Sequence, residues 1–233
     1  MSVDLRSVFS RWCSGLPAKA DEESFVLVTP QGTGDRPHWN FTDFELGGPD
    51  DVSFIRDLLD TLESRLCIDP SRVYATGISN GAAMSVRLAC DLADRVAAVG
   101  AVAGLYYPRD CPSTRPVPVI AFHGTDDPVV PFEGGQIAAG LRLSIRPIEE
   151  SAADWAKHDG CGRGPEQERV AESVRLVRYT GCEWEAAVDL YIIEGGGHTW
   201  PGAAIDVPPL GATTHEIVAT DLIWAFFEAH PMR

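Results

Sequence analysis

The sequence of 233 residues lacks several features that mark membrane and metal-binding proteins. No apolar run is long enough to span a bilayer, and residues 1–20 contain no apolar segment of the signal-peptide kind. The six cysteines form no C-x-x-C pair, so we expect no zinc site. No other metal or organic cofactor is implied, and the chain as given carries no mark for export.

Basic residues are also scarce: the chain has 19 Lys and Arg residues but 34 Asp and Glu residues, which gives a formal net charge of −15. An acidic surface repels nucleic acid and anionic lipid, so we expect neither nucleic acid nor membrane as a partner. The hydrophobic fraction of 45% permits a core of ordinary size. No internal repeat is visible, and the length fits a single domain over residues 1–233.

The cysteines permit more than one pairing. Cys67 and Cys90 lie in helical apolar patterns, which predicts two buried thiols. Cys161 and Cys182 lie in glycine-containing loops, where a disulfide and two free thiols fit the residues equally well.

Helical and strand patterns alternate along the chain. Apolar residues recur at helical spacing in residues 51–66, 79–92, 151–158 and 214–229. Short apolar runs of the β type occupy residues 25–28, 72–76, 96–102, 117–122, 174–179 and 187–193. This alternation predicts an α/β fold with a mostly parallel sheet and helices on both faces. We expect the glycine-rich segment 128–147 to form a loop with a weak helix.

The sequence Gly-Ile-Ser-Asn-Gly at residues 77–81 fits the pattern G-x-S-x-G between a predicted strand and a predicted helix. That context indicates a nucleophile elbow, a tight turn that lifts a serine hydroxyl above the sheet. Glycine at both flanks is expected to avoid steric clashes in the turn. Ser79 is therefore the candidate nucleophile, and the backbone N–H of Asn80 is the candidate oxyanion donor. A turn that merely caps the helix is the alternative.

A serine hydroxyl needs a base to take its proton. In folds that carry a nucleophile elbow, the acid and then the histidine follow the serine along the chain. His198 is the favoured base because it follows a strand in a loop with four glycines at residues 195–202. The acid should follow the strand 117–122, where the residues alone leave Asp126 and Asp127 equally possible. The other histidines are not favoured as the base. His38 precedes the serine, and His123 is expected to be a packed structural residue. His158 and His215 are expected to be solvated, and His230 to lie in a frayed C-terminus.

Five stretches, at residues 39–40, 50–55, 68–81, 123–132 and 194–202, together resemble the polyhydroxybutyrate depolymerase-like and feruloyl or acetylxylan esterase-like α/β-hydrolases. The resemblance covers most of the chain from about residue 25 onward and implies the α/β-hydrolase fold. It implies that Asp127 is the acid and that Trp39 and Trp200 help to line the acyl pocket, with core packing as the alternative for either tryptophan. It also implies the Cys161–Cys182 disulfide and a secreted protein.

The resemblance has one departure. Members of the family have earlier strands and a His-Gly turn that supplies a second oxyanion amide, and no such stretch precedes residue 25. We therefore expect an N-terminally shortened sheet with an exposed edge, which homodimerisation could cover.

These observations predict a serine carboxylic ester hydrolase that works through an acyl-enzyme. Its partner would be a small-molecule or polysaccharide-linked ester: a feruloyl, acetyl or short aryl ester, or a hydroxyalkanoate oligomer. An inert ligand-binding relative and a serine peptidase of the same fold are the alternatives.

Overall fold

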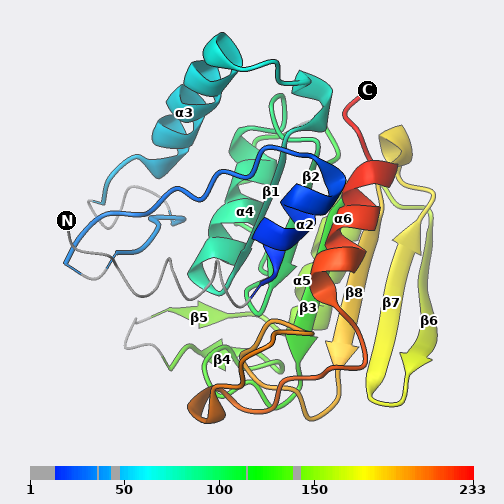
Figure 1. The fold of residues 1–233 in the computed structure, drawn as a ribbon. Coiled ribbons are helices and arrows are strands. Elements are labelled where there is room, and N and C mark those ends of the chain that lie inside the picture. Colours follow the sequence, from blue (N-terminus) through cyan, green and yellow to red (C-terminus); the bar gives the residue numbers. More distant parts are fainter. Residues whose placement is uncertain (1–13, 36, 43–47, 114, 139–142) are drawn as a thin grey trace.

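The computed structural model describes residues 14–35, 37–42, 48–113, 115–138 and 143–233 (Figure 1). Its α-helices are α2 (Leu16–Glu23), α3 (Asp51–Arg65), α4 (Asn80–Asp91), α5 (Ile148–His158) and α6 (Ala219–Ala229). Its strands are β1 (Tyr74–Ile78), β2 (Ala98–Val102), β3 (Val119–Gly124), β4 (Gly135–Gln136), β5 (Ser144–Ile145), β6 (Arg163–Ala171), β7 (Val174–Thr180) and β8 (Val188–Ile193).

Six strands form one sheet in the order β1-β2-β3-β8-β7-β6. The first four are parallel, and β7 and β6 continue the sheet in antiparallel fashion beyond β8. The expected mostly parallel sheet is thus confirmed. The carboxyl ends of β1, β2, β3 and β8 lie at the same edge of the sheet, so the loops that follow these strands meet there.

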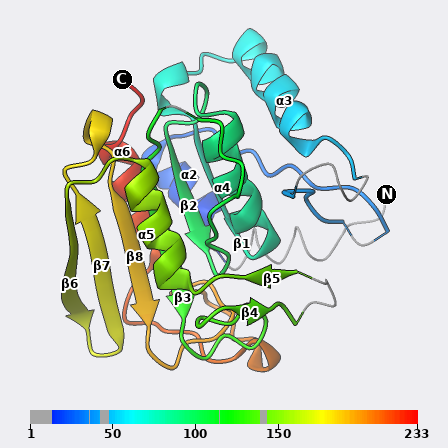
Figure 2. The ribbon, with the colours of Figure 1, turned by 180° about the vertical axis from the view of Figure 1, so that it is seen from behind.

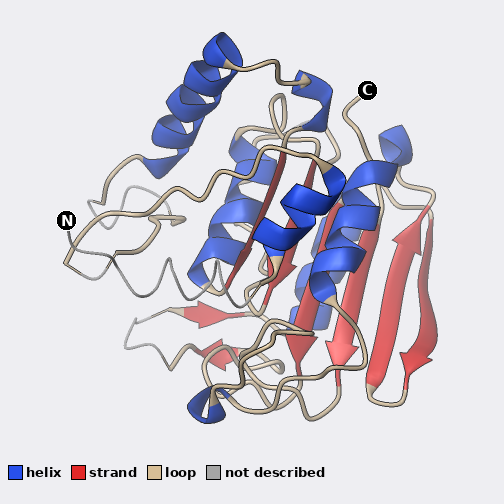
Figure 3. Ribbon diagram, viewed as in Figure 1, coloured by secondary structure: helices blue, strands red, loops and turns tan. Residues whose placement is uncertain are grey.

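Helices cover both faces of the sheet, as the sequence predicts (Figures 1, 2 and 3). Helices α2 and α6 lie over one face, while α4 and α5 lie over the other. Alternate residues of β2 serve the two layers: Val99 and Ala101 pack toward α4 and α5, and Ala98 and Val102 pack toward α6. A strand that is buried on both faces must be apolar throughout, which is why the strand patterns read as continuous apolar runs.

Three segments differ from expectation. Residues 25–28 form no strand, because no described strand pairs with their backbone; Phe25 still stacks on Trp224 of α6 at 4.4 Å, while Val26 is 57% exposed. Among the described residues of segment 128–147, the short hairpin of β4 and β5 replaces the expected weak helix. Strand β6 escaped prediction because it is a polar, exposed edge strand without apolar alternation.

Two disulfides join cysteines on one side of the molecule. Cys161 pairs with Cys182, and Cys90 pairs with Cys111. The expectation of two buried thiols was wrong: Cys90 is buried but bonded, and Cys67 is free and exposed. Each bridge closes a loop of 21 residues, worth about 3 kcal/mol in chain entropy.

A buried carboxyl group lies beside the Cys161–Cys182 bridge. The Asp159 side chain is fully buried after α5, and neither of its oxygens meets a donor in good hydrogen-bond geometry. Burial raises its pKa to about 8, and the nearby Val117 amide and Arg115 guanidinium offset only part of this effect. Asp159 is therefore protonated in the folded protein at neutral pH.

This protonation makes stability depend on pH. The unfolded carboxyl ionises near pH 4, so between about pH 4 and pH 8 the folded state holds one more proton and the free energy of unfolding falls as pH rises. We expect Asp159→Asn to become progressively more stable than the wild type over this range, by a few kcal/mol. Urea unfolding at pH 5 and pH 8 would measure the difference, with the exposed Asp21→Asn as control. A difference that does not change with pH would contradict the assignment.

Candidate active site

The chain reverses sharply at Ser79, between the end of β1 and the start of α4. Its φ of 57° is left-handed, a conformation that strains a residue other than glycine by about 1–2 kcal/mol. The turn is held because the Ser79 N–H donates to the Val102 carbonyl at 2.8 Å, and the Ser79 carbonyl accepts from Ala83 at 2.9 Å. Ser79 thereby lies half-buried at the carboxyl edge of the sheet.

The two glycines of the turn have different roles. A Cβ atom on Gly77 would lie 2.5 Å from the Gly81 carbonyl carbon, so this position excludes any side chain. A Cβ atom on Gly81 would meet nothing within 4 Å, so the expected steric need at this flank is wrong. Gly104, after β2, is constrained as well, because its Cβ would lie 2.5 Å from the Ser79 carbonyl oxygen.

This asymmetry predicts opposite effects of the same substitution. Gly77→Ala should lower the free energy of unfolding by about 2–3 kcal/mol, since backbone rather than a flexible side chain must move. Gly81→Ala should raise it by about 0.5–1 kcal/mol, because alanine suits a helix better than glycine. Urea unfolding of the two variants would measure both changes. Equal destabilisation by both would contradict the geometry of the turn.

Asn80 is the first residue of α4, where backbone amides have no acceptor within the helix. Across the described ranges, no group accepts a hydrogen bond from its N–H. Its side chain contacts the backbone of Trp39: Oδ1 accepts from the Trp39 N–H at 2.7 Å, and Nδ2 donates to the Trp39 carbonyl at 2.9 Å. The amide is thus available to an oxyanion, while the carboxamide is engaged elsewhere.

Asp127 and His198 meet in a buried hydrogen bond. Asp127 lies three residues beyond β3, His198 lies five beyond β8, and the His198 Nδ1 is 2.8 Å from Asp127 Oδ2. The other carboxylate oxygen accepts from the backbone N–H groups of Val129 and Val130, both at 2.8 Å. These two amides fix the carboxylate, which in turn fixes the imidazole. Asp126 is exposed and is not a partner of His198.

His123, on β3, lies beneath the same carboxylate. Its Nε2 is 2.9 Å from the Val130 carbonyl and 3.4 Å from Asp127 Oδ2. Burial lowers the pKa of His123, against the opposing effects of the Val130 carbonyl and the Asp127 charge. The ring is therefore neutral, and its N–H donates to Val130. The expectation of a packed structural histidine is confirmed, with the added role of lying against Asp127.

The loop that carries His198 depends on close backbone approach. A Cβ atom on Gly197 would lie 2.2 Å from the Leu210 carbonyl oxygen, and one on Gly124 would lie 2.1 Å from the Gly196 carbonyl oxygen. The His198 N–H also donates to the Leu210 carbonyl at 2.6 Å. Gly124 and Gly197 are therefore needed because the backbones of neighbouring loops pack closely against them, and not because the loop has to move.

Ser79, Asp127 and His198 all follow parallel strands at one sheet edge. Within the part of the chain that the structure describes, the Ser79 hydroxyl makes no hydrogen bond to the His198 imidazole. In ligand-free enzymes such bonds are often long and tighten when the substrate binds.

The two tryptophans have different surroundings. Trp39 is half-buried and stacks on Phe54 of α3, with 6.3 Å between ring centroids. Trp200 is only 5% exposed and its Nε1 donates to Thr220 Oγ1 at 3.0 Å, within the core layer of α6. Core packing thus accounts for Trp200. The Trp39 ring packs at the margin of the core, and its backbone is bound by the Asn80 side chain, next to Ser79 in the chain.

Two other histidines are better ordered than the sequence indicated. His158 is half-buried, with Nδ1 3.0 Å from the Tyr107 hydroxyl, and burial lowers its pKa. His230 is half-buried, with Nδ1 2.7 Å from the Phe226 carbonyl. Neither is solvated or frayed, because a neighbouring group from the core contacts each ring.

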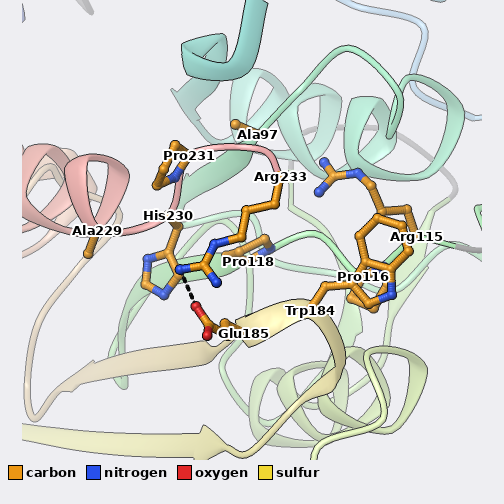
Figure 4. A pocket seen from close by; sticks show the side chains of 10 residues that line it. All are labelled: Ala97, Arg115, Pro116, Pro118, Trp184, Glu185, Ala229, His230, Pro231 and Arg233. Carbon is orange, nitrogen blue, oxygen red and sulfur yellow. Dashed lines mark ion pairs between the residues drawn. The ribbon is translucent and has the colours of Figure 1, made fainter.

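A small hollow lies at the opposite edge of the sheet (Figure 4). Ala97 and Pro118 line it immediately before β2 and β3, and Trp184 and Arg233 line it as well. It is remote from the carboxyl ends of the strands and so lies apart from Ser79.

No group of His, Cys, Asp and Glu side chains among the described residues could hold a metal ion. No described helix is both long and apolar enough to cross a membrane.

Comparisons with known proteins relate the chain to esterases. Feruloyl esterase B from Piromyces equi is 35% identical over 156 residues, which cover 64% of this chain and 29% of that protein. Feruloyl esterase D from Neurospora crassa is 31% identical over 186 residues, covering 79% and 57%. Feruloyl esterase C from Emericella nidulans is 30% identical over 217 residues, covering 92% and 68%. The chain thus spans less than two thirds of the length of the first two relatives.

The fold has a solved counterpart in the acetyl xylan esterase from Aspergillus awamori. The TM-score is 0.62 at 15% sequence identity, with 92% of this chain and 81% of that chain covered. A family model described as phospholipase/carboxylesterase matches residues 44–163, more than half of the chain. With the parallel sheet and the strand–serine–helix turn, this match shows that the chain belongs to the phospholipase/carboxylesterase family of α/β-hydrolases.

Proposed function

We propose that this chain is a serine carboxylic ester hydrolase with Ser79 as nucleophile, His198 as base and Asp127 as the acid that orients the base. The observation that carries the proposal is the buried 2.8 Å hydrogen bond between His198 and Asp127. It leaves the other imidazole nitrogen, Nε2, to receive a proton at the sheet edge where the strained Ser79 turn lies.

The reaction would proceed in two halves. Ser79 Oγ attacks the ester carbonyl carbon while its proton passes to His198 Nε2, and the carbonyl oxygen becomes an oxyanion facing the Asn80 N–H. The tetrahedral intermediate then collapses, the ester C–O bond breaks, and His198 returns the proton to the leaving alcohol. Water, deprotonated by His198, attacks the acyl-enzyme in the same manner, releasing the carboxylic acid and restoring the Ser79 hydroxyl.

Relatives support the substrate class. Three of them are named feruloyl esterases, and the structural neighbour is named an acetyl xylan esterase. Feruloyl and acetyl esters, free or linked to a polysaccharide, are accordingly the first candidates, followed by short aryl esters and hydroxyalkanoate oligomers. The half-buried Trp39, whose backbone is bound by the Asn80 side chain, favours an aromatic acyl group among them.

A fluorophosphonate probe followed by peptide mapping tests the proposal. The probe should attach to Ser79 alone, and the protein should hydrolyse methyl ferulate and 4-nitrophenyl acetate but not the matching anilides. A folded protein that reacts with neither probe nor ester would instead be an inert relative, and rapid anilide cleavage would indicate a peptidase. Either outcome overturns the assignment.

A further inference from the structure

We propose that the Asn80 carboxamide is a positioning residue: it holds the Trp39 loop (residues 38–42) beside the nucleophile and so favours esters with an aromatic acyl group. This inference rests on the proposed ester hydrolysis. It assigns to the Asn80 side chain a role separate from that of its backbone N–H.

The first support is the reciprocal pair of hydrogen bonds between Asn80 and Trp39. Oδ1 accepts from the Trp39 N–H at 2.7 Å and Nδ2 donates to the Trp39 carbonyl at 2.9 Å, although 41 residues separate the two. Two bonds of opposite sense fix both the position and the orientation of the Trp39 backbone. Because Asn80 follows Ser79 directly in the chain, these bonds tie the Trp39 backbone to the residue next to the proposed nucleophile.

A second anchor holds the Trp39 loop from its other side. The Asn40 N–H donates to Asp51 Oδ2 at 2.6 Å, and Asp51 is a buried residue at the start of α3. The Asn40 side chain also donates to the Pro49 carbonyl at 2.9 Å. The loop is therefore bound to the first turn of α3 through Asp51 and to the first turn of α4 through Asn80. Loss of the Asn80 contacts would leave the contact with α3 in place.

The loop carries aromatic rings that suit a planar ligand. Trp39 stacks on Phe54, while Phe41 packs edge-on against Tyr106 at 5.4 Å and accepts a hydrogen bond from the Tyr106 hydroxyl through its carbonyl. Offset stacking on such rings stabilises a bound aromatic acyl group, and an acetyl group is too small to use it. The carboxamide of Asn80 should therefore matter more for feruloyl than for acetyl esters.

The test is the ratio of kcat/KM for methyl ferulate to kcat/KM for 4-nitrophenyl acetate. We expect Asn80→Ala to lower this ratio about tenfold, mainly through KM, because it removes two neutral hydrogen bonds from the loop. Trp39→Ala should give a similar loss, and the double variant should lose little more, since both act through the same ring. Ser85→Ala, which removes another side-chain hydrogen bond on α4, should leave the ratio unchanged.

Amide hydrogen exchange gives a readout that needs no activity. The Trp39 amide should exchange about tenfold faster in Asn80→Ala, as expected for loss of its acceptor. Should Asn80→Ala not fold, the isosteric Asn80→Asp serves, because its carboxylate still accepts from the Trp39 N–H but repels the Trp39 carbonyl and should still lower the ratio. Unchanged exchange in Asn80→Ala overturns the positioning role, and an unchanged ratio in Asn80→Asp does so where the alanine variant does not fold. Equal losses for both esters or additive single effects overturn the selectivity. A wild type inactive on both esters would disprove the hydrolase proposal instead, while exchange still tests the contact.

Discussion

Replacing Ser79 by alanine should lower kcat for ester hydrolysis by about 10⁶-fold, the loss found when a serine hydrolase loses its nucleophile. The substitution removes only the hydroxyl group, and no other side chain of the strained turn offers an equivalent nucleophile. KM should change little, because the Trp39 loop and the Asn80 N–H remain in place. Steady-state hydrolysis of methyl ferulate would measure both constants.

The strain at Ser79 also supplies the control for this variant. Alanine accepts a φ of 57° no more readily than serine, so Ser79→Ala should keep the wild-type melting temperature within a few degrees. Ser85→Ala, which removes a hydroxyl from the next turn of α4, should retain activity. Residual activity in Ser79→Ala within about tenfold of the wild type would show that another group attacks the ester.

Features set by local sequence were predictable. The turn at Ser79 follows from glycine and serine spacing between an apolar strand and an apolar helix, and the parallel order follows from alternating patterns. The carboxyl-edge location of Asp127 and His198 then follows from topology, because both come soon after parallel strands. The choice between Asp126 and Asp127 came from family resemblance, since both carboxylates occupy the same turn.

Contacts between distant segments escaped prediction. Cys90 lies in a buried helical pattern, and nothing local reveals that Cys111, in a coil 21 residues later, reaches it. The Asn80–Trp39 contact likewise joins residues that only the folded chain brings together. Strand β6 pairs through its backbone at an edge, so its charged side chains gave no strand signal. For Cys90 and Asn80 the decisive partner is remote in sequence, whereas β6 pairs with the neighbouring β7 and lacks only the apolar pattern.

Asp127→Asn should lower kcat by about 10⁴-fold, whereas Asp126→Asn should change it less than twofold. The reason lies in the two amides that fix the carboxylate. Val129 and Val130 both donate to Asp127 Oδ1, so the asparagine oxygen must stay there and its NH₂ group must face His198. His198 Nδ1 then becomes an acceptor, its proton moves to Nε2, and Nε2 can no longer accept the Ser79 proton.

Asp126 offers a matched control within the same turn, because it is exposed and, among the described residues, its side chain accepts a hydrogen bond from Thr125 alone. Steady-state kinetics at neutral pH would compare the two variants, and fluorophosphonate labelling should slow in parallel for Asp127→Asn alone. Because the asparagine can keep both backbone bonds, that variant should fold, and its lost activity would report the tautomer of His198. Equal activity in the two variants would mean that the buried hydrogen bond does not orient the base.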